Sequence, residues 1–187
     1  MLTWNLGAYE ITFDFGLLLR WIVAYLLVVL VHELGHGVVG WLYGWRRASV
    51  HFGVPSDWRR ALSLTFLPIP IHFHLGLGLF YAPPSIWFAD AERNLPPARD
   101  AMFAAGGPIA TASLLAIPAV RTEAIRIVQG ITERRLSADT FTGAVAAWTL
   151  FLILVPLIPK RYRSVQCDSD GLRIMRFLPH LIAARRR

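Results

Sequence analysis

Long apolar runs alternate with short polar segments along the chain, and three of these runs predict membrane-spanning helices. They cover residues 21–44, 101–120 and 140–159, and the second and third contain no charged side chain. A transmembrane helix needs about 20 predominantly apolar residues. The pattern therefore predicts an α-helical integral membrane protein, with three transmembrane helices in one domain that covers residues 1–187.

A fourth apolar stretch, residues 61–82, has a different pattern. Prolines interrupt its centre, and apolar side chains then alternate with His72 and His74. A period of two is typical of a strand. It predicts an extended segment over residues 66–80, and a small membrane-associated β hairpin or sheet within residues 48–80.

The last residues, 171–187, place apolar side chains at helical spacing among several arginines. This spacing predicts a C-terminal amphipathic helix on the membrane surface. A packed surface helix followed by a disordered arginine tail fits the same residues.

Composition supports a membrane protein. The hydrophobic fraction is 55% without glycine, whereas soluble chains reach roughly 45–50% with glycine included. A net charge of +7 is compatible with nucleic-acid binding, but the basic residues flank the apolar runs and form no stripe of their own. We therefore expect a lipid bilayer as the surroundings and no nucleic acid as a partner.

The distribution of lysine and arginine predicts an orientation. With three spans, 14 of these residues lie on one side of the membrane and 5 on the other. Because cytoplasmic loops carry the excess of positive charge, the N-terminus is expected outside and the C-terminus in the cytoplasm. This is the arrangement of a multi-pass protein of a bacterial-type inner or cell membrane, and it would change if residues 61–82 also crossed.

Ionisable residues interrupt the first run in the sequence VHELGHG, residues 31–37. Such groups are costly at membrane depth and usually mark a functional site. On a helix, His32 and His36 lie on one face and can bind one metal ion, while Glu33 stands beside it to accept a proton from water. Two imidazoles and one carboxylate suit zinc.

A third protein ligand is then needed. Residues 168–171, DSDG, follow the third run and lie on the same predicted side as the two histidines. An Asp-Gly pair can turn the chain back toward the membrane, although an ordinary surface turn would be favoured if the HELGH motif were absent. The candidate ligands are Asp168, Asp170, His51, His72, His74 and His180.

Taken together, HELGH in a first membrane helix, Gly-Pro in a later one, and LIP followed by Asp-Gly resemble the site-2 protease family of intramembrane zinc metalloproteases. The resemblance covers residues from about 21 to 176. It implies that His32, His36 and Asp170 bind zinc and that Glu33 is the general base. It also implies a minimal core, without an appended PDZ or cystathionine-synthase domain.

Two further motifs of that family are similar to segments of this chain. Gly-Pro-x-x-Asn corresponds to GPIAT, in which Thr111 follows Gly107 and Pro108, and Asn-x-x-Pro corresponds to PLIP, which begins with Pro156. In the family these asparagines help to hold the substrate or the oxyanion. The resemblance thus implies that residues 107, 108 and 111 contact substrate, and that the extended segment containing His72 and His74 pairs with it.

The expected function is zinc-dependent cleavage of a membrane protein or membrane-anchored peptide. One alternative is a catalytically silent relative that binds client transmembrane helices, suggested by Thr111 and Pro156. Another is a membrane metal carrier, which would usually need several ligand clusters along a path. The intact Glu33 favours the protease, and no particular oligomeric state is predicted.

Overall fold

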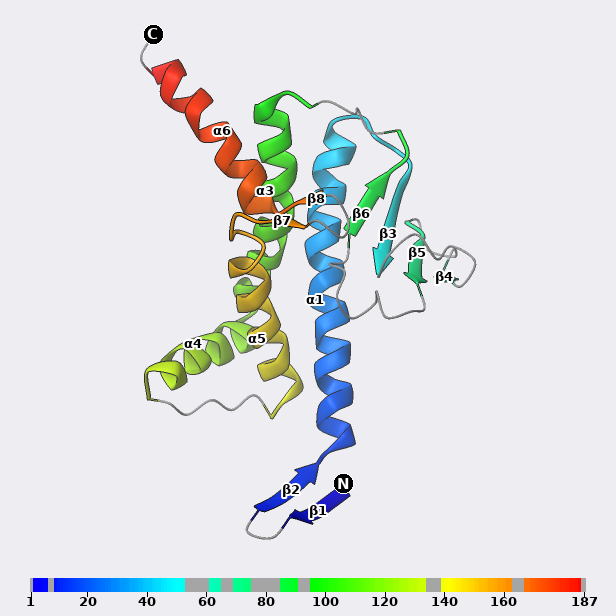
Figure 1. Ribbon diagram of the computed structural model, residues 1–187, viewed down its shortest axis with the longest axis vertical. Coiled ribbons are helices and arrows are strands. Elements are labelled where there is room, and N and C mark those ends of the chain that lie inside the picture. The colour runs from blue at the N-terminus through cyan, green and yellow to red at the C-terminus, as the bar shows by residue number, and fades with distance from the viewer. Residues whose placement is uncertain are drawn as a thin grey trace.

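The long helix α1 (Phe15–Leu42) is the central element of the fold in the computed structural model. A four-stranded sheet lies along one side of it, and helices α3, α5 and α6 lie along the other (Figure 1). The structure describes residues 2–6, 9–52, 61–64, 69–74, 85–90, 95–133, 139–162 and 167–185.

Helix α1 is long and apolar enough to cross a membrane. Asp14 caps its start by accepting a hydrogen bond from the Gly16 N–H at 2.8 Å, and the chain turns away at Gly44, where φ is +90°. Its 28 residues correspond to about 42 Å at helical rise, against roughly 30 Å for a hydrocarbon core. Large apolar side chains such as Leu19, Val38 and Leu42 remain exposed, as lipid contact requires. The predicted helix over 21–44 is confirmed, although it begins earlier.

The second predicted span is bent. Helix α3 (Pro97–Ser113) continues through the short 3-10 helix η2 (Leu114–Ala116) and is followed by α4 (Pro118–Glu133) at an angle of 101°. Ile117 has extended backbone angles, the conformation that a following proline favours. Residues 101–120 are therefore not one straight helix, and the bent pair is either a broken span or a re-entrant loop.

Helix α5 (Phe141–Leu154) covers most of the third predicted span. Its 14 residues reach only about 21 Å, which is less than the hydrocarbon thickness. Among the described helices, one is clearly long enough to span, or two if the bent pair counts as one. The prediction of three transmembrane helices is therefore not established by helix length.

The sheet contains strands β3 (Ala48–Phe52), β4 (Ala61–Leu64), β5 (Ile71–His74) and β6 (Ser85–Phe88), in the order β4-β5-β3-β6. The predicted β element is confirmed at β5, which pairs in parallel with β3. Residues 65–68 and 75–84 lie outside the described part of the chain. Because β5 also pairs with β4, residues 71–74 have no free edge. Residues 71–74 therefore offer no edge to substrate, whereas pairing through the rest of the predicted segment 66–80 stays a prediction. Among the described strands, the edges of the sheet are β4 and β6.

The two faces of the sheet differ in chemistry. Val50, Phe52 and Ile71 form a buried cluster with Val29 of α1. Since side chains alternate along a strand, His51, His72 and His74 lie on the opposite face. The prediction that His72 and His74 share a face is confirmed, but this face points away from α1.

The remaining elements of the described chain are one C-terminal helix and two small two-stranded sheets. Helix α6 (Asp170–Arg185) confirms that the C-terminal segment is helical. Two small hairpins pair β1 (Leu2–Leu6) with β2 (Tyr9–Phe13) and β7 (Arg161–Tyr162) with β8 (Cys167–Asp168). Small buried residues, among them Ala24, Ala124 and Ala144, form a second apolar cluster, which packs α1 against α4 and α5.

Candidate metal centre

Helices α1 and α3 approach each other closely at the level of the HELGH motif. A Cβ added to Gly35 would lie 2.2 Å from the Gly106 carbonyl oxygen, and one added to Gly106 would lie 2.7 Å from the Gly35 carbonyl oxygen. Only glycine permits such a contact between two backbones. The crossing therefore places the next residue of α3, Gly107, directly against the two histidines of α1.

Both imidazole rings are held through their Nδ1 atoms. His36 Nδ1 donates to the Phe103 carbonyl oxygen at 2.7 Å. His32 Nδ1 lies 2.9 Å from Thr111 Oγ1, whose own hydroxyl donates to the Gly107 carbonyl oxygen. Thr111 therefore accepts a hydrogen bond from His32. With the proton on Nδ1 in both rings, each Nε2 offers a lone pair, which is the tautomer that binds metal.

Asp170 joins the two rings from the other end of the chain. Its Oδ2 lies 3.2 Å from His32 Nε2 and 3.5 Å from His36 Nε2. The three ligand atoms lie within 4.8 Å of one another, and His32, His36 and Asp170 form a group that could hold a metal ion. The structure thus brings the predicted ligand set together. Asp168 instead contacts Arg176.

Asp170 is positioned by its neighbours in the chain. Ser169 accepts hydrogen bonds from the backbone N–H groups of Lys160 and Leu172 and donates to the Ile158 carbonyl oxygen. A Cβ on Gly171 would lie 1.9 Å from the Leu157 carbonyl oxygen, so the start of α6 fits tightly against the turn after α5. Burial raises the pKa of Asp170, but its contacts with His32 and His36 outweigh this effect and lower the pKa to about 2. The carboxylate is therefore ionised at neutral pH.

Glu33 is buried beside the two histidines and contacts the sheet. One carboxylate oxygen accepts a hydrogen bond from the Ile86 backbone N–H at 2.7 Å. Ile86 lies opposite Val50 in β6, and its N–H points away from β3, toward the free edge of the sheet. The candidate general base is thus anchored to the edge strand nearest the metal ligands.

The residues predicted to contact substrate have other positions. Thr111 is fully buried and holds His32, and its predicted contact with substrate stays a prediction. Gly107 faces the two Nε2 atoms, and Pro108 is buried within α3. His72 and His74 lie on the sheet face that points away from α1, so the structure does not bring them to the centre.

His74 belongs to a second histidine cluster on that face. His51 Nδ1 lies 2.9 Å from His74 Nε2, and His51 Nε2 lies 2.8 Å from Ser49 Oγ. Burial, together with the neighbouring His72 and His74, lowers the pKa of His51 to about 4. The His51 side chain is therefore neutral at physiological pH.

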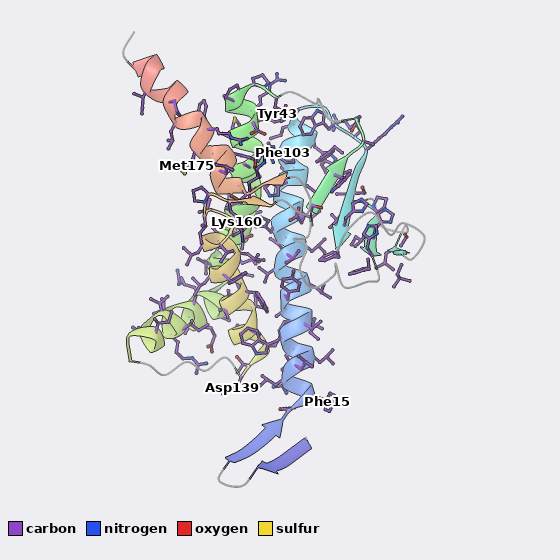
Figure 2. The ribbon with its side chains drawn as sticks, in the orientation of Figure 1. Phe15, Tyr43, Phe103, Asp139, Lys160 and Met175 are labelled. Atoms are coloured by element: carbon purple, nitrogen blue, oxygen red, sulfur yellow. The ribbon has the colours of Figure 1, made fainter. Side chains whose placement is uncertain are left out.

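Three contributors to the centre were not predicted. Phe103, which Figure 2 labels on α3, supplies a backbone carbonyl to His36 and stacks on its ring. Ile86 supplies a backbone N–H to Glu33, and neither backbone role has a side-chain signature. Ser169 could have been found, because a serine directly before a helix is a capping signal.

Comparisons with protein-family models, curated proteins and solved structures found no match for this chain. Its function must therefore be inferred from the geometry of the centre. The resemblance to the site-2 proteases rests on the short motifs described above.

Proposed function

We propose that this protein is a zinc-dependent intramembrane endopeptidase of the site-2 protease type. The observation that supports it best is the convergence of His32, His36 and Asp170 on one point, although 138 positions separate His32 from Asp170. Glu33 lies next to both histidines in the same helix. This is the ligand and base arrangement of a zinc hydrolase.

The chemistry of the donor set favours a metal ion. Each histidine uses Nδ1 for a hydrogen bond within the protein, so two Nε2 lone pairs and a carboxylate oxygen face one another. Without a cation these groups repel, and one metal ion satisfies all three. Imidazole favours zinc and its neighbours over magnesium or calcium, which prefer oxygen ligands.

The alternative within the same geometry is an ion pair between a protonated His36 and Asp170. It would satisfy the Asp170 carboxylate, but among the described residues it would leave the buried Glu33 carboxylate with a single hydrogen-bond donor, the Ile86 N–H. A buried ion pair is costly to desolvate and gives little net stability. Zinc content of the purified protein distinguishes the two.

Each residue then has a defined role. Zinc bound here would polarise the scissile carbonyl and activate a water molecule at neutral pH. Glu33 takes the proton of that water and passes it to the leaving amine. The Ile86 N–H holds one Glu33 oxygen in place, which leaves the second oxygen for the proton.

The substrate is a membrane-embedded or membrane-anchored segment in extended form. We infer that it pairs with the free edge of β6, because this edge adjoins Glu33 through Ile86. Addition of a strand to an open edge supplies backbone hydrogen bonds, and side-chain pockets add specificity. This replaces the segment around β5 as the pairing site.

A multi-pass arrangement is also part of the proposal. Helix α1 would cross the bilayer with its N-terminus outside and the C-terminal end of the chain in the cytoplasm. Exposed apolar side chains on the other helices support this, including Ile109 on α3 and Phe151 and Leu154 on α5. A metal carrier is less well supported, since among the described residues a single group could hold a metal ion.

The decisive experiment combines zinc content with cleavage of a model single-span substrate in detergent. Glu33→Gln should retain zinc and lose at least ~100-fold in cleavage rate, the usual scale for a general base. His36→Ala should lose both. Full activity in Glu33→Gln would refute the mechanism and leave the metal site intact, whereas zinc-free wild-type protein would refute both.

A further inference from the structure

A cavity of about 280 Å³ lies against the free edge of β6. One wall is the strand itself, residues 86–88, and the opposite wall contains Phe103 of α3 and Arg173 of α6. Trp45 and Leu95 also line it. The cavity therefore occupies the space that a strand added to β6 would face.

Two backbone groups connect this cavity to the candidate centre. Ile86 lines the cavity and donates its N–H to Glu33. Phe103 lines the cavity and accepts the Nδ1–H of His36. A segment bound along β6 would thus have one side chain in the cavity while a nearby peptide bond lies at the base and the metal ligands.

The lining is mainly aromatic. Trp45 contacts Phe88 and Phe103, with ring centroids 5.3 and 5.5 Å apart. Aromatic rings attract further rings in edge-to-face or offset geometry. The wall therefore favours an aromatic side chain over a short polar one.

Among the described residues of the lining, the single charged side chain, Arg173, is already paired. Arg173 Nε donates to Asp100 at 2.9 Å, and the guanidinium lies 4.9 Å from the centre of the Phe103 ring. Its charge is thereby compensated by a carboxylate within the protein. An acidic side chain would gain little from this wall, because Asp100 already occupies the guanidinium.

We propose that this cavity is a specificity pocket for one large apolar side chain of the substrate, preferably phenylalanine or tryptophan, next to the scissile bond. This inference rests on the proposed protease function and names its substrate class. The volume leaves room for such a side chain, because it approaches the roughly 300 Å³ at which pockets for whole small molecules begin.

Peptide binding tests the pocket without cleavage. The probe is a fluorescein-labelled nine-residue peptide of serine and threonine with alanine, leucine, phenylalanine, tryptophan or glutamate at its centre. Binding to zinc-loaded Glu33→Gln protein in dodecyl maltoside is followed by fluorescence anisotropy. The phenylalanine and tryptophan peptides should bind at least ~10-fold more tightly than the alanine peptide, as a well-formed apolar pocket permits, and the glutamate peptide should show no gain.

A matched pair of variants locates the effect. Leu95→Trp fills the cavity and should reduce the ratio of phenylalanine to alanine affinity to near one, without weakening the alanine peptide. Leu62→Trp places the same indole on β4, the opposite edge, where residue 62 is 58% exposed, and should leave the ratio unchanged. Zinc content checks that both variants are folded.

The same peptide series, inserted into a model single-span membrane substrate, separates the two proposals. Cleavage by wild type without side-chain preference would overturn the pocket and leave the protease. Selective binding without any cleavage would overturn the protease and leave the pocket. A phenylalanine-to-alanine affinity ratio below ~3 in the Glu33→Gln protein, or an unchanged ratio when Leu95→Trp is added, overturns the pocket. Loss of the preference on addition of phosphatidylcholine also overturns it, since a lipid chain would then be the occupant.

Discussion

Gly107→Ala provides a direct test of the metal site. The added Cβ would lie 2.4 Å from His36 Nε2 and 2.6 Å from His32 Nε2. Zinc binds imidazole nitrogen at about 2.0–2.1 Å, so the new methyl group would stand close to where the ion must sit. The substitution places one carbon atom in the ligand sphere and removes no ligand.

The rings cannot easily make room for this methyl group. Non-bonded heavy atoms prefer separations of about 3.5–4.0 Å, so each ring would have to move by roughly 1 Å. His36 is held by the Phe103 carbonyl and His32 by Thr111. We therefore expect at least a 100-fold loss of zinc affinity, which is about 2.7 kcal/mol at 1.36 kcal/mol per decade.

The assay is competition for zinc against a chromophoric chelator, with purified protein in detergent. Alanine favours a helix over glycine by about 1 kcal/mol, so circular dichroism should show an intact helix content. Gly37→Ala is the matched control in α1, because among the described residues its Cβ would meet only the Ile86 Cδ1 atom, at 3.0 Å. Wild-type zinc affinity in Gly107→Ala would refute the placement of the ion between the two Nε2 atoms.

Further predictions concern the third ligand, the base, the histidine cluster and the topology. Asp170→Ala should lose zinc stoichiometry whereas Asp168→Ala keeps it, and the reverse result would reassign the third ligand. Ile86→Pro removes the N–H bonded to Glu33 and should lower kcat about 10- to 100-fold with zinc retained, since hydrogen bonds to charged groups contribute about 1.5–3 kcal/mol. The control Ile86→Val keeps the donor and should retain kcat. Equal kcat values in the two variants would exclude this anchoring role. The pKa of His51 is about 4 in the folded protein, against 6.5 ordinarily. Between these two pH values the unfolded state binds more protons than the folded state. The Tm in detergent should therefore fall as pH falls from about 6.5 to 4. His51→Gln should flatten that dependence, and an equally steep curve in this variant would assign the effect to another group. Reporter fusions should place the N-terminus outside and the C-terminus in the cytoplasm, and two cytoplasmic ends would contradict the charge-based orientation.

Local spacing was sufficient to predict several parts of this protein. The interval of four between His32 and His36 places both rings on one helix face wherever that helix lies. The alternation around His72 specifies a strand with a polar and an apolar face, and the structure shows both. The apolar run of α1 likewise specified a long helix, because most of its side chains are apolar and it contains no proline.

Long-range packing decided what these local patterns left open. Whether Asp168 or Asp170 joins the histidines depends on how Ser169 and Gly171 fit the turn after α5, which no spacing rule specifies. The interior position of β5 depends on pairing with β4, the strand before it, and also in parallel with β3, which is not consecutive with it in the chain. The anchor of Glu33 is a backbone N–H, which every residue except proline possesses. Only the fold determines which of these identical groups points at the carboxylate.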